Sequence, residues 1–335
     1  LIGYISGGGG RSILLEPPYT TVQDHGFYFQ DDWKVAPKLT LNLGVRYDLF
    51  VPDVEIRNRI VNFDLTNLKM AYAGEDGISN RAGKQTRRAN FGPRVGLAYN
   101  VGGNGKTIIR SGYAISYFPI MPSGSNMLNE QVPYIVSQTP FGNIPVNPTN
   151  FSSIPTINQP FPSIQIFKPR TTAEINASPI GIIGHGFRNE TPSMMTWSFN
   201  IERQIGNSMM AEIAYAGSHG THLLFAYNPN EVQPGTGSVQ SRRLLQPINN
   251  ISSITIFDPR NSSIYNGLSG KLEKRFSSGL QFMAGYTFAK NLDYGGSAAS
   301  GGGQTGGLQT ITNIRAARGA SGFDVKHRFV ANYVY

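Results

Sequence analysis

The chain has 335 residues, and its 29 basic and 20 acidic side chains give a formal net charge of +9 at pH 7. The basic residues are scattered and form no run or basic helix, which argues against nucleic-acid binding. Cysteine is absent, which excludes disulfides and thiolate metal sites and fits an exported bacterial surface protein. No stretch approaches 18 uninterrupted apolar residues, so the sequence contains no transmembrane helix.

Within residues 39–50 (LTLNLGVRYDLF), apolar side chains alternate strictly with polar or small ones as far as Leu49. The odd-numbered positions from Leu39 to Leu49 are apolar, whereas the even-numbered positions include Asn42, Arg46 and Asp48. Because successive side chains of a strand point to opposite faces, this segment has one apolar and one polar face. Its length is close to the roughly 9–11 residues of a tilted strand that crosses a bilayer.

The same alternation predicts nine strands along the chain. They cover residues 26–35, 39–50, 91–101, 107–118, 195–205, 209–218, 265–276, 280–290 and 324–335. Short segments rich in Gly, Asn, Ser or Pro join them in pairs at residues 36–38, 102–106, 206–208 and 277–279. Such residues favour tight hairpin turns.

The connections between the hairpins are long, at residues 51–90, 119–194, 219–264 and 291–323. We expect them to be irregular loops, since they show no helical period. Short and long connections alternate without exception, which places all turns at one end of an antiparallel sheet. The predicted fold is therefore all-β: an up-and-down meander that forms part of a large transmembrane β-barrel, with short periplasmic turns and long extracellular loops.

Strand parity also assigns the charged side chains to faces. Most of them share the polar face, which would line the lumen of the barrel, because a charge facing lipid is costly. The lumen-facing candidates are Arg46, Arg94, Arg110, Glu202, Glu212, Lys271, Glu273 and Arg275. Asp31 and Arg203 have apolar-face parity, but both lie close to short turns, and Trp33 suits an aromatic girdle there. A soluble β-sandwich is the alternative, although its connections would not segregate by length.

Three other motifs favour structural over chemical roles. Residues 102–107 (GGNGKT) lack the first glycine of a phosphate-binding loop and precede a strand, so we predict a hairpin turn. His219 and His222 have no supporting carboxylates, and we place them at a strand end or in a loop. Asp31 and Asp32 are adjacent in a strand and cannot face one substrate together. The chain shows no enzyme signature, and we expect neither a metal nor a cofactor.

Five aromatic residues in the long loops are candidate ligand contacts. Their rings could stack on a sugar or a siderophore, but we favour packing of the loops against one another. They are Tyr134, Phe141, Phe151, Phe161 and Phe167.

Short segments spread along the whole chain resemble the TonB-dependent receptors of the bacterial outer membrane, in particular the Oar-like group. The strongest are residues 28–35 (YFQDDWKV) and 39–48 (LTLNLGVRYD). The others are residues 93–98 (PRVGLA), 215–220 (YAGSHG), 274–280 (KRFSSGL), 285–293 (GYTFAKNLD) and 323–329 (FDVKHRF). Their order along the chain makes the set more specific than any one segment.

The resemblance implies a barrel of about 22 strands closed by a plug domain. Residues 1–335 would then be a partial barrel domain, an internal piece that lacks the plug, the final strands and the segment that contacts the TonB energy-coupling complex. The implied partners are outer-membrane lipid, the plug, TonB and a small-molecule, saccharide or peptide substrate. The implied function is energy-coupled uptake of a substrate. An ungated porin or a surface adhesin built on the same barrel and loops is the alternative.

Overall fold

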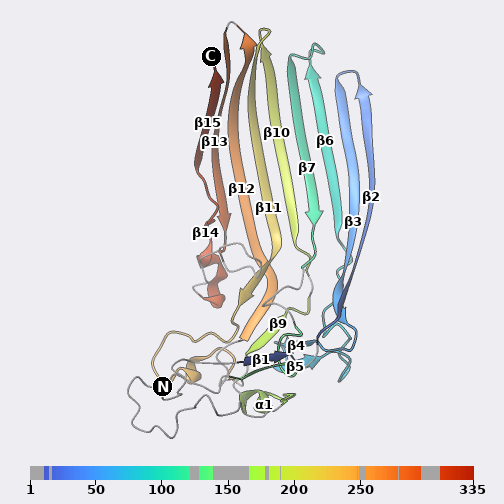
Figure 1. The fold of residues 1–335 in the computed structure, drawn as a ribbon, viewed down its shortest axis with the longest axis vertical. Coiled ribbons are helices and arrows are strands. Elements are labelled where there is room, and N and C mark those ends of the chain that lie inside the picture. The colour runs from blue at the N-terminus through green and yellow to red at the C-terminus, as the bar shows by residue number, and fades with distance from the viewer. Residues whose placement is uncertain are drawn as a thin grey trace, which may run out of the picture.

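The computed structural model describes residues 11–14, 17–120, 128–138, 166–177, 181–188, 190–246, 248, 254–277, 279–295 and 310–335. Its long elements are strands (Figure 1). In chain order the elements are β1 (Arg11–Leu14), β2 (Thr20–Ala36), β3 (Leu39–Glu55), β4 (Val61–Asp64), β5 (Lys69–Tyr72), β6 (Phe91–Val101), β7 (Thr107–Tyr117), β8 (Ile135–Gln138), α1 (Thr172–Ala177), β9 (Ile182–His185), β10 (Ser193–Ile205), β11 (Met209–Tyr227), η3 (Gln240–Arg242), β12 (Ile254–Ser277), β13 (Leu280–Asp293), η4 (Ile311–Ala317), β14 (Gly319–Ala320) and β15 (His327–Val334).

One large sheet dominates the part of the chain that the structure describes. Its strands follow the order β14-β13-β12-β11-β10-β7-β6-β3-β2, while β15 pairs with β13 and β9 with β12. Every long strand is antiparallel to its neighbours. The predicted meander of nine long strands is therefore confirmed.

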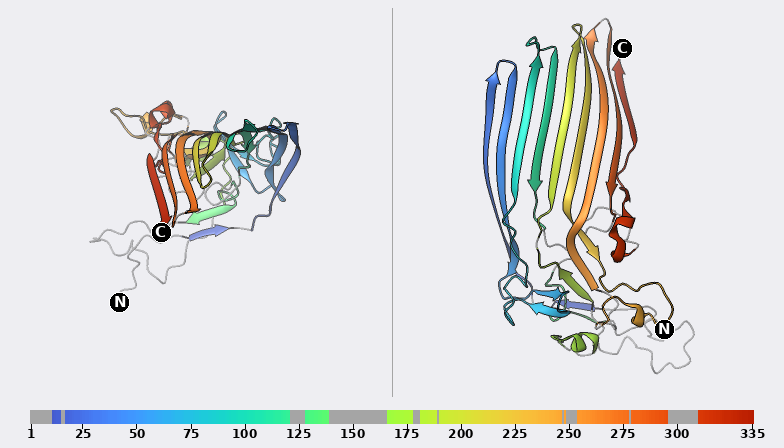
Figure 2. Two further views of the ribbon diagram at one scale, coloured as in Figure 1. Left: turned by 90° about the horizontal axis from the view of Figure 1, so that it is seen from above. Right: turned by 180° about the vertical axis from the view of Figure 1, so that it is seen from behind.

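The sheet is curved and open (Figure 2). Strand β2 forms one edge, and β15 forms the other. Within the described residues these two edges do not pair with each other, so the sheet is an arc of wall rather than a closed cylinder.

Four tight turns join the long strands at one end of the sheet, which lies at the top of Figure 1. Gly102, Gly206 and Gly279 have φ values of +73°, +61° and +74° there, a region that glycine enters without steric cost. In the turn between β6 and β7, the side-chain oxygen of Asn100 accepts a hydrogen bond from the backbone N–H of Gly105 at 3.0 Å. This segment is a hairpin turn, as predicted.

Several strands are longer than the sequence predicted. Strand β11 continues to Tyr227 instead of ending near residue 218, and β12 begins at Ile254 instead of residue 265. The extra residues pair with each other, and Phe225 and Ile256 are buried among the long loops. A second core therefore stabilises the sheet beyond its predicted length. The last strand is shorter than predicted and begins at His327, because Asp324 is part of a turn.

The expectation that the long connections are irregular is wrong for several segments. Strands β4 and β5 form a hairpin, β1 pairs with β8, and β9 adds to β12 in parallel. Together with α1 they gather at the end of the sheet opposite the short turns (Figure 1). We call the elements β1, β4, β5, β8, α1 and β9, together with the described loop residues around them at this end of the sheet, the cap.

The cap has its own hydrophobic core, in which residues from four long connections meet the ends of β11 and β12. Its buried members are Val61, Phe63, Met70, Tyr72, Ile175, Ile182, Phe225, Tyr227, Ile248, Ile254 and Ile256. Contacts of this kind bury apolar side chains that would otherwise face water, which stabilises the loops as one unit.

Strand β9 is the centre of the cap. One side of it pairs with β12. On its other side, the buried amide of Asn62 accepts a hydrogen bond from the backbone N–H of His185 at 2.7 Å and donates to the His185 carbonyl at 3.0 Å. The side-chain amide of Gln131 makes the same two hydrogen bonds with Ile183. Its oxygen accepts from the backbone N–H at 3.0 Å, and its nitrogen donates to the carbonyl at 2.7 Å. Two side-chain amides thus replace a neighbouring strand.

Candidate functional site

The register of the sheet brings the eight lumen-facing candidates onto one face. Residues that are directly paired across strands share a face, and Gly44 on β3 pairs with Arg94 on β6. In the same way Glu202 pairs with Glu212, and Glu212 pairs with Lys271. The polar face, as we call it, carries Arg46, Arg94, Arg110, Glu202, Glu212, Lys271, Glu273 and Arg275.

Side chains of opposite charge or matching polarity contact one another along this face. Arg110 on β7 forms an ion pair with Glu202 on β10. The side chain of Asn200 donates a hydrogen bond to Glu212 across the next strand pair at 2.6 Å. Lys271 and Glu273 are separated by one residue on β12 and form an ion pair, with Lys271 Nζ 2.9 Å from Glu273 Oε2. These contacts partly neutralise the half of the polar face that is near the short turns.

The other half of the polar face is hollowed. A hollow of about 570 Å³ extends across β2 to β12. Just over half of its lining residues are glycine, alanine, serine or threonine, and the others include Gln30, Asn42, Arg94, Tyr265 and the larger apolar residues Leu43, Val95, Tyr113 and Trp197. Arg46 lies nearby in a second hollow of about 220 Å³, which Arg94 also lines. The Nε atom of Arg46 donates a hydrogen bond to the buried carboxylate of Asp48 at 2.9 Å. The small side chains leave room on this face for another molecule or domain.

The opposite face, which we call the apolar face, exposes large hydrophobic side chains on strand after strand. Phe29, Ile213 and Phe329 have exposed fractions of 70%, 62% and 68%. Phe199 and Leu268 are also exposed. Soluble monomers rarely expose a continuous apolar surface of this extent, so the apolar face requires a nonaqueous environment.

Two charged exceptions predicted for the apolar face are confirmed. Asp31 pairs with Leu43, and Arg203 pairs with Thr107 and Ala211 near the short turns. Arg203 also donates a hydrogen bond to the hydroxyl of Thr107. Asp32 points to the polar face instead, where it accepts a hydrogen bond from Asn42 at 2.6 Å, so the two aspartates do not form one site.

Sequence reasoning missed two polar side chains on the apolar face near the cap. Asn266 and Lys290 are register partners and share the face of Trp197. Tyr215 donates a hydrogen bond to Asn266 at 2.6 Å and accepts one from the indole N–H of Trp197 at 3.4 Å. The sequence did contain a signal for Lys290. Apolar residues occupy the even-numbered positions of β13 up to Phe288, and the same alternation places Lys290 on the apolar face.

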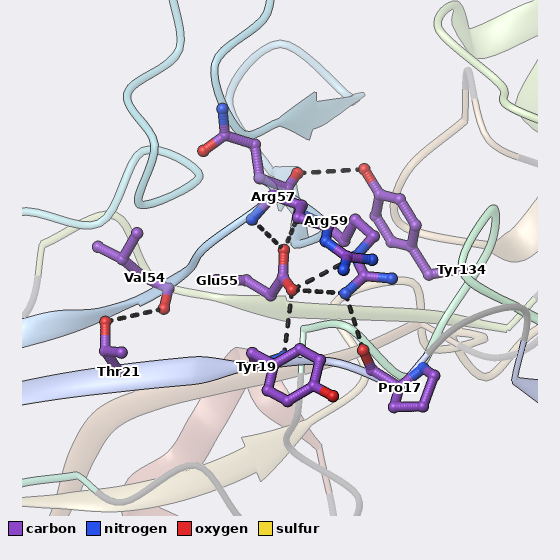
Figure 3. A network of polar contacts seen from close by, with 9 residues as sticks. Pro17, Tyr19, Thr21, Val54, Glu55, Arg57, Arg59 and Tyr134 are labelled. Carbon is purple, nitrogen blue, oxygen red and sulfur yellow. Dashed lines mark hydrogen bonds and ion pairs between the residues drawn. The ribbon is translucent and has the colours of Figure 1, made fainter.

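A buried carboxylate holds the base of the cap (Figure 3). Glu55, at the end of β3, is fully buried, and it accepts hydrogen bonds from the side chain of Arg59 at 2.8 Å and from the backbone N–H groups of Arg57, Arg59 and Tyr19 at 2.8, 2.8 and 3.1 Å. Burial raises the pKa of Glu55, but these donors outweigh it and lower the pKa to about 2. Glu55 therefore stays ionised and fixes the direction of the chain where it leaves the sheet at the end of β3.

Of the five candidate loop aromatics, two lie in the described part of the chain. Tyr134 is partly buried against the cap core, and its hydroxyl donates to the carbonyl of Asn58 at 3.3 Å. Burial raises the pKa of the Tyr134 hydroxyl. Phe167 is partly exposed. Phe141, Phe151 and Phe161 lie outside the described residues. Tyr134 thus packs between loops, and a contact of this residue with a ligand stays a prediction.

Both residues of the histidine pair lie on β11. His219 lies within β11, paired with Met195 and Ile264, and not at a strand end as predicted, because β11 continues past it. His222 follows at a bulge with φ +53°. No group of three or more His, Asp or Glu suited to a metal ion occurs among the described residues. In the same part of the chain, the helices lack the length and hydropathy needed for a membrane crossing.

Comparison with known proteins identifies the class of protein that has this two-sided sheet. Residues 1–335 match the family described as outer membrane beta barrel domain. The chain belongs to this family of outer-membrane β-barrel proteins. It therefore lies in the outer membrane, which provides the lipid that the apolar face requires. None of the curated proteins compared with the chain matches it.

Solved structures similar to the chain include the outer membrane transporter YddB from Escherichia coli (12% identity, TM-score 0.41) and the siderophore receptor PirA from Pseudomonas aeruginosa (13%, 0.41). A third is the pyoverdine outer membrane receptor FpvA from Pseudomonas aeruginosa (13%, 0.39). The matches cover 82%, 81% and 84% of this chain. They cover 25%, 36% and 27% of those proteins, so the chain spans about a third of their length or less.

Proposed function

We propose that the chain is a wall segment and extracellular cap of a gated TonB-dependent receptor of the Oar-like group, which takes up its substrate through a plugged barrel. The observation that carries the proposal is the two-sided sheet. Apolar side chains cover one face, and all eight charged candidates share the other. In an outer-membrane barrel the polar side faces the lumen.

The polar face suits a lumen that holds a plug better than an empty channel. Just over half of the residues that line the hollow of about 570 Å³ are glycine, alanine, serine or threonine, and Arg94 is among the others. A folded domain can approach a wall of glycine and alanine closely, whereas bulky side chains would keep it away. The order of the receptor-like segments from residue 28 to residue 329 supports the same assignment.

The cap suits a first contact with the substrate, because it stands at the end of the sheet opposite the short turns (Figure 1). Long loops of outer-membrane barrels are extracellular. Phe167 and the three candidate aromatics outside the described residues remain our candidates for contacting a small molecule, saccharide or peptide there. The plug domain and the TonB complex are the proposed protein partners.

Conductance of the whole gene product in planar bilayers tests the gated function. A plugged receptor should give almost no steady current until the plug is deleted from the gene. A large steady current from the intact protein would show instead an ungated porin. Growth on candidate substrates with and without the TonB gene provides the second test, since a surface adhesin would bind its ligand without TonB-dependent uptake.

A further inference from the structure

A cationic strip crosses the apolar face where β13 approaches the cap. Lys290 is on this face by register, since it pairs with Asn266. Residues 319–326 run beside the end of β13: Ala320 pairs with Leu292, and the backbone N–H of Ala289 donates to the carbonyl of Lys326 at 3.0 Å. Lys326 is therefore opposite Ala289 and beside Lys290, and its ammonium group lies over the ring of Phe288, which belongs to the apolar face.

The two lysines flank one carboxylate and the edge of the aromatic surface. Lys290 Nζ lies 2.5 Å from Asp324, whose Oδ1 accepts the backbone N–H of Asn291 at 2.7 Å. The Nζ atom of Lys326 lies 5.9 Å from the centre of the Phe288 ring. The strip of Lys290, Asp324 and Lys326 therefore has a net positive charge.

Large apolar side chains border this lysine strip. Phe288 and Phe329 belong to the apolar face and have exposed fractions of 45% and 68%. Phe323 and Val325, on either side of Asp324 in sequence, are exposed by 67% and 61%. Cationic groups beside exposed hydrocarbon fit an amphiphile with an anionic headgroup better than they fit a soluble anion.

The height of the strip matches a membrane surface. Lys290 is ten residues beyond Leu280, where β13 leaves the short turn, which corresponds to about 33 Å along the strand. With a tilt of about 35–45°, this becomes a height of about 25 Å, close to that of the apolar band of an outer-membrane barrel. The strip therefore lies where the acyl chains end and the headgroups of the outer leaflet begin.

We propose that the lysine strip binds a phosphate group of an outer-leaflet lipid, with the acyl chains of that lipid lying on Phe288 and Phe329. The ammonium groups supply the positive charge, and Asp324 holds Lys290 in position. Exposed Arg318, next to β14, adds a further cation at the cap side. This site depends on membership of the outer-membrane family and not on the transport function proposed above.

Native mass spectrometry of the full-length protein in mild detergent tests this site, with diphosphorylated lipid A as the probe and the same lipid without phosphates as the comparison. Each lysine near an anionic lipid surface contributes to the free energy of lipid binding. We therefore expect K326A to weaken binding about five-fold and K290A/K326A about thirty-fold. The double arginine variant K290R/K326R should bind like the wild type, because it keeps both charges.

The matched control removes two lysines at the opposite rim, Lys38 and Lys106, which lie in the short turns. K38A/K106A should leave lipid A binding unchanged. An unchanged dissociation constant in both K326A and K290A/K326A would overturn the proposal, and so would equal binding of the lipid without phosphates. Displacement of lipid A by inorganic phosphate alone would assign the site to a free anion and overturn the lipid assignment.

Discussion

The indole ring of Trp197 on β10 lies against the Cα atom of Gly217, its register partner on β11. A Cβ atom at position 217 would overlap three atoms of that ring, Cε2, Nε1 and Cζ2. Both residues belong to the apolar face. The missing side chain of Gly217 thus creates the space in which Trp197 lies flat and reaches the hydroxyl of Tyr215.

Substituting Gly217 by alanine should displace this ring. Overpacking in a well-packed environment costs about 1–3 kcal/mol, and the hydrogen bond from Trp197 to Tyr215 would be lost as well. We expect the free energy of unfolding of the full-length protein, measured by urea titration in lipid vesicles, to fall by that amount.

The matched control is Gly270→Ala on β12, where a Cβ atom would meet no other atom within 4 Å. Because alanine is favoured over glycine within a strand, this variant should be as stable as the wild type or slightly more stable. Equal stability of the two variants would show that Trp197 does not depend on the space at Gly217.

Spin labels on neighbouring positions of β3 test the assignment of the two faces. Residues 1–335 contain no cysteine, so the single variants V45C and R46C each introduce the only thiol of this segment. A label at position 45 should be accessible to oxygen dissolved in lipid, whereas a label at position 46 should be accessible to a water-soluble nickel complex. Matching accessibilities at both positions in the intact membrane protein would refute the two-sided sheet.

Acid should weaken the base of the cap through Glu55. Its pKa falls from an ordinary value of 4.5 to about 2 in the folded protein, so its contribution is present above about pH 4.5 and is lost as the pH falls towards 2. The shift corresponds to about 3 kcal/mol. Urea titrations at about pH 7, pH 4 and pH 2 should show this loss in the wild type.

The variant Glu55→Gln cannot ionise at this position, so it should be less stable than the wild type at neutral pH and should lose less stability in acid. Glu130→Gln, which changes an exposed carboxylate of the cap, serves as the control and should follow the wild type. A wild-type acid dependence in Glu55→Gln would show that another group is responsible.

Loss of the Asn62 amide should loosen the cap and leave the wall intact. Asn62→Ala removes the partners of the His185 backbone groups and of the Ala82 carbonyl, and each buried polar group left unpaired costs about 1–3 kcal/mol. We expect proteases to cut the cap of this variant in whole cells faster than that of the wild type. Asn104→Ala, in the opposite turn, should show no such change.

Alternation of side chains was sufficient to predict the wall, because each strand of a two-sided sheet carries the same local signal. Residues 39–50 show it most clearly, and the faces of Arg46, Asp31 and Arg203 followed from parity alone. The cap could not be predicted in this way. Strand β9 has four residues, and its partners on β12 lie about 70 positions later in the chain, so its stability comes from nonlocal contacts that leave no periodic pattern.

Sequence reasoning about the site had the same limit. It identified the charged residues of the polar face, but not the contacts by which Asn200 and Asp48 hold two of them. It also gave Tyr134 two alternative roles, and the packing of this side chain against the cap core could not be predicted from its place in a long loop. Parity on β13 could have placed Lys290 on the apolar face, but its contact with Asp324 depends on the pairing of residues 319–326 with the end of β13, which the sequence does not show.

The length of β12 determines how the protein meets its surroundings. With 24 residues it measures about 79 Å, whereas a bilayer needs only about 9–11 residues of a tilted strand. More than half of the strand, together with the end of β11, therefore projects beyond the hydrocarbon region. Large particles such as antibodies or phage tails would contact the cap well before they reach the lipid surface.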